Sequence, residues 1–178
     1  MSKQPLVRRQ LPGRSTPWSF SQRLAAGAFD LAWALLCGWT PKPLNPWRLF
    51  VLRVFGAKIV GTPFVHQRAR IALPWNVELH DRACVGDRTN LYALDRITLG
   101  AGALVAQEAY LCTGTHDVAD TEWPLMTAPI VVGERAFVGA RAFVLPGVTI
   151  GTNAVVGAMS VVTSDVAAAA SVRGNPAR

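Results

Sequence analysis

The most regular feature of the chain is a hydrophobic position that recurs every six residues in its C-terminal part. Each step of six reaches a β-branched aliphatic residue, at Val132, Val138, Val144, Ile150, Val156 and Val162. Four residues after the first five of these stand small or β-branched residues, namely Ala136, Ala142, Val148, Ala154 and Ser160. Glycine directly follows the aliphatic residue at positions 133, 139, 151 and 157. Each unit therefore has one large apolar position, one small position and, in most cases, a glycine.

This period differs from those of the common elements, because a strand repeats every two residues and a helix every 3.6. A six-residue period indicates short strands joined by tight turns, for which glycine gives the backbone the freedom that a corner needs. Three units then form one triangular coil, and stacked coils place the large aliphatic residues above one another. An ordinary β-sandwich does not explain six consecutive matches, so we expect a β-helix.

The same period extends upstream, but at two places the series is displaced by two residues, which we call slips. Its positions are Ile59, Val65, Ile71 and Val77, then Leu79, Val85, Leu91 and Ile97, then Leu99, Val105 and Leu111. The pattern stops between Cys112 and Val131, and a segment that interrupts a solenoid must leave it as a loop. Loops on a rigid scaffold often carry function. We therefore predict a β-helix over residues 57–166, within a domain of residues 57–178, and a protruding loop at 112–131.

The first 56 residues follow a helical pattern instead, and we treat residues 1–56 as a basic, helical cap segment. Apolar residues fall at helical spacing at Phe20, Leu24, Ala28, Leu31 and Leu35, and Trp33 and Leu36 widen this face. Ser19 or Ser21 is suited to begin the helix, and Gly38 and Pro41 to end it. A second short helix is expected from Trp47 to Phe55. Two roles stay open: a lid that covers the first coil, which we favour, and peripheral docking on a membrane.

Composition and charge narrow the class of protein. Hydrophobic residues make up 51% of the chain and charged residues only 16%, so the chain either buries much of itself or pairs with copies of itself. The net charge of +7 favours anionic partners. No nucleic-acid-binding motif accompanies this charge, so we expect no nucleic acid partner.

Cysteine usage and hydropathy indicate a cytoplasmic protein. Cys37, Cys84 and Cys112 are an odd, widely spaced set, which gives neither a disulfide framework nor a CxxC metal site. The longest apolar stretch, residues 24–39, contains Asp30 and falls short of the roughly 20 residues that span a bilayer. We expect neither a signal peptide nor a transmembrane helix, and the inner face of the membrane is the place for any peripheral contact.

Four segments give the chain a family resemblance. These are RVFGAKI (53–59), PWNVELHD (74–81), LCTGTHD (111–117) and the run from PGVTIG (146–151) to GNPAR (174–178). Together with the repeat and the loop, they resemble the hexapeptide-repeat O-acetyltransferases, and more closely the exopolysaccharide type of colanic acid biosynthesis than the maltose and galactoside acetyltransferases. The resemblance implies a left-handed parallel β-helix, a homotrimer with active sites between subunits, acetyl-CoA as the donor and a saccharide or saccharide-like acceptor.

The chemistry of acetyl transfer singles out His116. The acceptor hydroxyl must lose a proton as it attacks, and histidine can accept a proton near neutral pH. In the resembled family the histidine of the LCTGTHD motif is the base. Asp117 is a candidate to orient the imidazole. Cys112 is an alternative candidate, as a catalytic nucleophile, but a packed thiol is the simpler interpretation. We therefore expect direct transfer without an acyl-enzyme.

The resemblance also assigns binding residues. The candidates for the acceptor are Asn90, Tyr92, Asp95 and Trp123, and those for the cofactor are Phe137, Gly139, Ala140, Ala158, Thr163 and Arg178. The chain departs from the family at Ala93 and Ser164, where relatives often carry a polar residue and a lysine. These departures put one acceptor contact and one phosphate contact in doubt.

Two other functions remain open. His80 and His116 lie two coils apart, a spacing that resembles the metal ligands of γ-type carbonic anhydrases. However, position 121, where that family has its third histidine, is a threonine. Catalytic zinc requires three protein ligands, so we expect no metal. The other alternative is a non-catalytic solenoid trimer that serves as a scaffold.

Overall fold

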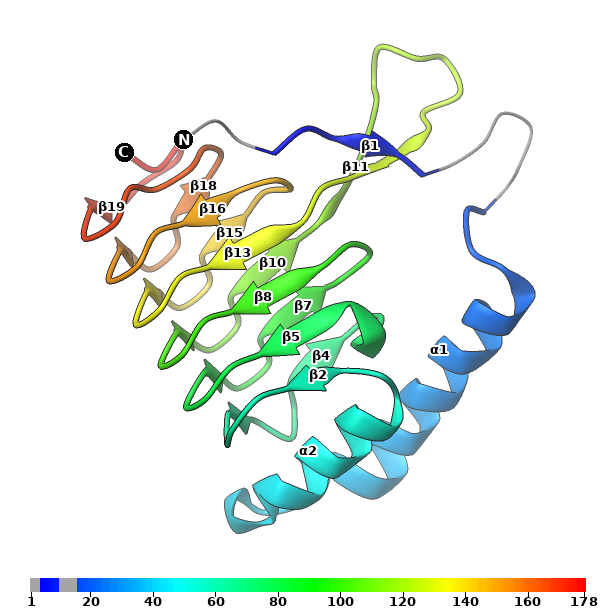
Figure 1. Cartoon of the computed structure of the whole chain (residues 1–178). Helices are drawn as coiled ribbons and strands as arrows, with labels where there is room; N and C mark the ends of the chain where they lie inside the picture. Colours follow the sequence, from blue (N-terminus) through cyan, green and yellow to red (C-terminus); the bar gives the residue numbers. More distant parts are fainter. Residues whose placement is uncertain (1–3, 10–15) are drawn as a thin grey trace.

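The protein folds as a parallel β-helix closed at one end by two helices (Figure 1). The structure is a computed structural model that describes residues 4–9 and 16–178. Three parallel sheets, which we number as faces 1 to 3 in chain order, form the sides of a triangular coil. The predicted mainly β architecture, with helices before the solenoid and a loop that leaves it, is confirmed.

Each face is a stack of very short strands. Face 1 contains β2 (Lys58–Ile59), β5 (Val77–Leu79), β8 (Ile97–Leu99), β13 (Ile130–Val132) and β16 (Thr149–Ile150). Face 2 contains β3 (Phe64–Val65), β6 (Cys84–Val85), β9 (Leu104–Val105), β14 (Phe137–Val138), β17 (Val155–Val156) and β19 (Ser171–Val172). Face 3 contains β4 (Arg70–Ile71), β7 (Asn90–Tyr92), β10 (Tyr110–Cys112), β15 (Phe143–Val144) and β18 (Val161–Val162).

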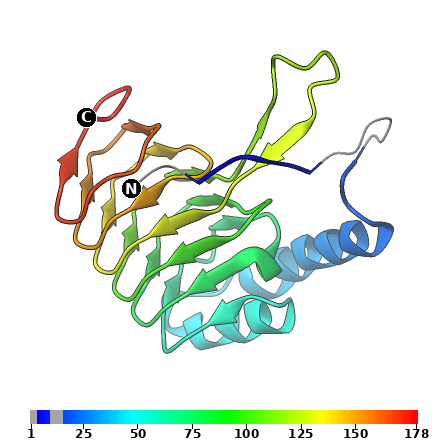
Figure 2. The same ribbon diagram turned by 45° about the horizontal axis from the view of Figure 1, so that its top comes forward.

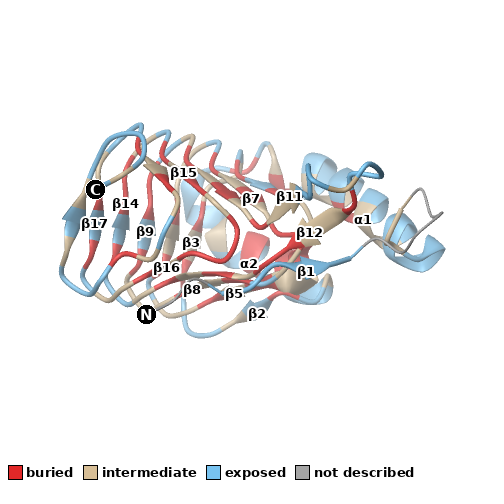
Figure 3. Cartoon of the chain, turned by 90° about the horizontal axis from the view of Figure 1, so that it is seen from above, coloured by how far each residue is buried: buried red, intermediate tan, exposed pale blue. Residues whose placement is uncertain are grey.

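The six-residue repeat builds the core. On face 1, Val132 pairs with Leu99 on one side and Ile150 on the other, and all three are fully buried. Figure 3 shows such buried positions recurring from coil to coil. Burial of these aliphatic side chains, worth roughly 1.5–3 kcal/mol each, is the main force that stacks the coils.

The two predicted slips are insertions at one corner of the coil, between faces 3 and 1. A short 3-10 helix, Pro74–Asn76, fills this corner in the first coil, and residues 93–96 fill it in the second. In the third coil the same corner releases the protruding loop. The longer coils therefore stack their extra residues beneath the segment that carries His116.

The glycines of the repeat act through close packing rather than through corner flexibility, which corrects the expectation from sequence. Residues such as Arg135 and Arg141, not the repeat glycines, take the left-handed backbone conformation in the corners, with φ of 51° and 58°. A Cβ atom at Gly133 would lie 2.6 Å from the amide nitrogen of Thr152, and one at Gly139 would lie 2.5 Å from that of Ala158. Glycine is therefore required because the next coil lies directly against it.

The helices α1 (Phe20–Ala32) and α2 (Asn45–Val54) cover the first coil, as expected of a lid. Ser19 begins α1 with a capping box that includes Gln22. A π-helical segment, Trp33–Cys37, continues α1 and ends at Gly38, and a 3-10 helix, Lys42–Leu44, leads into α2.

The apolar face that the sequence pattern assigned to α1 is not the face that packs. Phe29 is buried against the coil, with Trp33 partly buried beside it, whereas Phe20, Leu24 and Leu31 are exposed. Within the described residues, no helix is both long and apolar enough to cross a membrane.

The protruding loop is an antiparallel hairpin of β11 (Gly114–His116) and β12 (Leu125–Thr127). It stands out from the prism in Figures 1 and 2. The prediction of a loop at 112–131 was slightly too long, because Cys112 still belongs to β10 and Ile130 already belongs to β13. Strand β1 (Val7–Arg8) adds to the outer edge of β12, a pairing that the sequence did not predict.

Candidate active site

His116 ends strand β11, opposite Leu125 in β12, and its side chain is exposed on the hairpin. The imidazole Nδ1 atom lies 2.6 Å from the carbonyl oxygen of Trp123. A carbonyl only accepts hydrogen bonds, so the neutral ring carries its proton on Nδ1. The Nε2 atom is then left with a free lone pair, which is the form that a general base needs.

The turn at the hairpin tip brings the Trp123 carbonyl to the ring. Trp123 has φ of +47°, and its amide donates to the carbonyl of Asp120. The carboxylates of Asp117 and Asp120 each accept a hydrogen bond from the amide two residues further on, at Ala119 and Glu122. Such side-chain turns hold the chain in a defined path. The orienting group is thus a backbone carbonyl, and a role of Asp117 toward the imidazole stays a prediction.

A network at the base of the hairpin joins it to the coil and to the N-terminal strand. The Asp95 carboxylate accepts from the Arg9 guanidinium at 2.6 Å and from the Thr127 hydroxyl at 2.8 Å. Arg9 also donates to the Thr127 hydroxyl at 2.7 Å. Burial alone would raise the pKa of Asp95, but hydrogen bonds from Arg9, the Arg96 amide and Thr127 hold it below its usual value. Asp95 therefore anchors the hairpin, and an acceptor contact by Asp95 stays a prediction.

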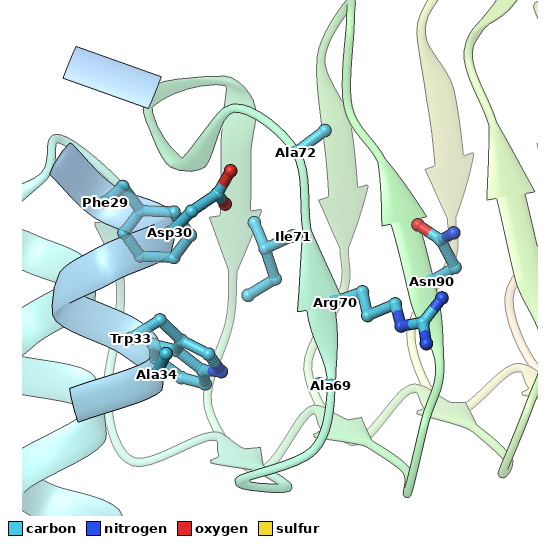
Figure 4. A pocket seen from close by; sticks show the side chains of 9 residues that line it. All are labelled: Phe29, Asp30, Trp33, Ala34, Ala69, Arg70, Ile71, Ala72 and Asn90. Atoms are coloured by element: carbon cyan, nitrogen blue, oxygen red, sulfur yellow. The ribbon is translucent and has the colours of Figure 1, made fainter. Parts of the chain in front are cut away.

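The remaining acceptor candidates lie on the outer side of face 3 or at the hairpin tip. Tyr92 lies beside Tyr110, whose ring stacks on Phe143 with centroids 4.9 Å apart. Asn90 lines a hollow of about 310 Å³ between α1 and face 3, together with Asp30 and Arg70 (Figure 4). Trp123 is exposed on the hairpin. The four predicted acceptor residues thus do not form one cavity within the chain.

Cys112 behaves as a packed thiol. Its Sγ atom lies 3.1 Å from the carbonyl oxygen of Gly114, and burial raises the pKa of the thiol above its usual value. A raised pKa lowers the thiolate fraction that a nucleophile requires. This environment supports transfer without an acyl-enzyme.

An open groove of about 410 Å³ runs along the corner between faces 2 and 3. Four of the six predicted cofactor residues line it, namely Phe137, Gly139, Ala140 and Ala158. Thr163 and Arg178 do not line it: Thr163 follows β18, and Arg178 pairs through its backbone with Arg173 in the last turn of the chain. Their roles toward a cofactor stay predictions.

The groove and His116 lie at different corners of the triangular coil. The groove follows the strands of face 2, whereas the hairpin connects β10 of face 3 to β13 of face 1. Within one chain, the candidate base and the candidate cofactor groove therefore lie at opposite edges of face 3. The base lies at the corner with face 1, and the groove lies at the corner with face 2.

The described residues contain no group of three or more His, Cys, Asp or Glu side chains that could hold a metal ion. The Nε2 atom of His80, the first histidine of the carbonic anhydrase alternative, lies 2.9 Å from the carboxylate of Glu78. Independence from metal stays a prediction.

Comparisons with known proteins define the family. A profile for the hexapeptide repeat of succinyl-transferases matches residues 129–164. The chain is 42% identical over 172 residues to a putative colanic acid biosynthesis acetyltransferase of Escherichia coli (strain K12), covering 95% of this chain and 94% of the relative. Its fold resembles a hexapeptide-repeat acetyltransferase from Vibrio cholerae (TM-score 0.81, 22% identity, 90% and 91% of the two chains). It also resembles a galactoside acetyltransferase solved with coenzyme A (TM-score 0.79, 19% identity, 92% and 82%). The chain belongs to the hexapeptide-repeat acetyltransferase family.

Proposed function

We propose that this acetyltransferase moves an acetyl group directly from acetyl-CoA to a hydroxyl of a saccharide acceptor, with His116 as the general base. The observation that carries the proposal is the hydrogen bond that Nδ1 of His116 donates to the Trp123 carbonyl. It leaves Nε2 free to take the proton of the hydroxyl as the hydroxyl oxygen attacks the thioester carbon. The tetrahedral intermediate then loses the thiolate of CoA, which receives the same proton from the imidazolium ring.

Two observations support acetyl-CoA as the donor. The galactoside acetyltransferase of similar fold was solved with coenzyme A, and a Vibrio cholerae relative with TM-score 0.75 was solved with acetyl coenzyme A. In this chain, the groove is lined by the small residues Gly139, Ala140 and Ala158, which leave its space unfilled. An open groove without bulky side chains suits the slender chain of a pantetheine arm. A reaction that uses acetyl-CoA as the donor also fits a location in the cytoplasm.

The names of the relatives support a saccharide acceptor. They include colanic acid biosynthesis, lipopolysaccharide biosynthesis and galactoside acetyltransferases. In this chain, Trp123, whose backbone carbonyl meets the imidazole, has an exposed indole that can stack on a sugar ring. Asn90, Tyr92 and Asp95 remain candidates for polar contacts.

The separation of His116 from the groove supports a site shared between copies. In a trimer with parallel axes, the hairpin of one copy is able to lie against the groove of the next. The low content of charged residues agrees with extensive burial between copies. We therefore include a homotrimer in the proposal.

A thiol-release assay with acetyl-CoA against a panel of saccharides tests the function. Release that depends on one class of saccharide, with an acetylated product seen by mass spectrometry, is the expected result. The His116→Ala variant is the control for release that does not use the site. Absence of turnover with every acceptor, although acetyl-CoA binds, would favour the scaffold alternative.

A further inference from the structure

The helical cap carries a continuous exposed apolar surface that the β-helix does not use. We call Leu35, Leu36, Trp39, Leu44, Trp47 and Phe50 the cap patch; these side chains range from 41% to 71% exposed. Four of them line one shallow hollow, and the Trp47 ring stacks on Phe50 with centroids 5.6 Å apart. Large adjoining apolar side chains are costly to leave in water, so a surface of this kind indicates a binding partner.

The two tryptophans of the cap patch have their polar atoms already satisfied. The indole N–H of Trp39 donates to the carbonyl of Leu35 at 2.8 Å, and that of Trp47 donates to the carbonyl of Leu36 at 2.9 Å. A buried N–H without a partner costs free energy, and here that cost does not arise. The rings can therefore enter an apolar medium without losing a hydrogen bond to water.

The chain segment that carries the cap patch has charges of one sign. Residues 31–77 contain no aspartate or glutamate, whereas Lys42 and Arg53 are exposed; the exposed Lys58 is paired with Glu78, just beyond this segment. The remaining charge of α2, Arg48, is buried and donates to the carbonyl of Val65. Exposed lysine and arginine beside aromatic and aliphatic residues match the boundary between anionic headgroups and acyl chains.

We propose that the cap patch docks this protein on an anionic lipid bilayer, with α2 and the end of the α1 segment lying in the plane of the interface. The exposed Phe20, Leu24 and Leu31 of α1 extend the apolar surface beyond the patch. No described helix is both long and apolar enough to span the bilayer, which fits a peripheral contact. A second copy packed cap to cap would bring two basic surfaces together, which disfavours it.

The location of the patch has a consequence for the enzyme. The cap closes the N-terminal end of the β-helix, and β19 and the C-terminus lie at the other end (Figure 1). A membrane bound at the cap leaves the hairpin tip and the groove accessible. The docking proposal does not depend on the proposed reaction and can be tested without any acceptor.

Flotation of the full-length protein with vesicles tests the proposal. We expect it to float with phosphatidylcholine vesicles that contain about a third phosphatidylglycerol, but not with pure phosphatidylcholine, and added salt should weaken binding. A wild type that stays unbound, or binds both vesicles equally, would overturn the proposal. Vesicles with brominated lipids should quench tryptophan fluorescence, because Trp39 and Trp47 would enter the interface.

Two variants of the cap separate lipid from protein contacts. Leu44→Glu combined with Phe50→Glu should lower vesicle binding by at least tenfold, whereas Val118→Glu, at an even more exposed apolar site on the hairpin, should show a much smaller loss. Lys42→Gln and Arg53→Gln should each weaken binding roughly fivefold. Light scattering completes the test: if the Leu44 and Phe50 variant changes the oligomeric mass, the patch is an interface between copies and the proposal fails.

Discussion

The imidazole of His116 is held by the carbonyl oxygen of Trp123, 2.6 Å from Nδ1, across the tip of the hairpin that carries both residues. The contact fixes the tautomer of the neutral ring and its orientation at the same time. It explains how a backbone carbonyl can position the candidate base on a protruding hairpin.

Replacement of His116 by alanine should abolish proton removal but not folding, because the exposed ring contributes no core packing. We expect kcat to fall by roughly 10²–10⁴-fold, with little change in acetyl-CoA binding. Steady-state kinetics and calorimetric binding of acetyl-CoA measure the two effects. A variant with wild-type kcat would show that the base is another residue.

Arg9 should act as a positioning residue for the hairpin. It joins Thr127 and Asp95 in a partly buried network, so Arg9→Ala should raise amide hydrogen exchange over 114–127 and lower kcat several-fold. Arg8 is the matched control, because its ion pair with Asp120 is solvent-exposed and such pairs contribute only about 0–1 kcal/mol. Equal effects of the two substitutions would show that the network around Asp95 has no special role.

The same network predicts a pH dependence of stability. The pKa of Asp95 is lower in the folded state than its ordinary value, so its contribution is present above the ordinary value of about 3.9 and is lost as pH falls through the folded pKa. Asp95→Asn should therefore destabilise the protein at neutral pH and weaken its acid dependence. Chemical denaturation at pH 7 and below pH 4 measures the difference between wild type and variant. An unchanged difference at the two pH values would contradict this assignment.

Two glycine substitutions should have opposite effects on stability. A Cβ at Gly139 would collide with the backbone at Ala158, so Gly139→Ala should destabilise by about 1–3 kcal/mol and narrow the groove. Gly27 lies within α1 with no atom near its Cβ position, so Gly27→Ala should stabilise by about 0.5–1 kcal/mol. Thermal denaturation of the two variants checks the signs. A harmless Gly139→Ala would mean that the coils can separate to admit a methyl group.

The β-helix was predictable because its side chains repeat. A buried aliphatic residue every six positions, as at Val138 and Val144, determines the stacking, and the interruption after Cys112 locates the hairpin. Four of the cofactor candidates that the family resemblance assigned lie in one groove, because they fall at the same corner of two adjacent coils.

Contacts that do not depend on side-chain type were not predictable. The carbonyl of Trp123 is a backbone group, which every residue possesses. Strand β1 contributes only Val7 and Arg8 to its sheet, too few residues for a periodic signal. Helix α1 carries apolar residues on two sides, so the pattern did not show that Phe29 rather than Leu24 faces the coil.

The last prediction tests whether the active site is shared between copies. His116→Ala removes the base but leaves the groove intact, whereas Ala158→Trp should fill the groove and leave the hairpin intact, because Ala158 is an exposed residue of the groove wall. Each variant alone should be inactive. If the hairpin of one copy serves the groove of the next, co-expression of the two should restore activity to roughly a quarter of wild type, since about one adjacent pair in four joins an intact groove to an intact hairpin. A site within a single chain predicts no recovery, because every chain then carries one lesion. Light scattering of the mixed sample is the control, since absence of mixed oligomers would remove the basis for recovery, and a monomeric wild type with full activity would contradict the shared site directly.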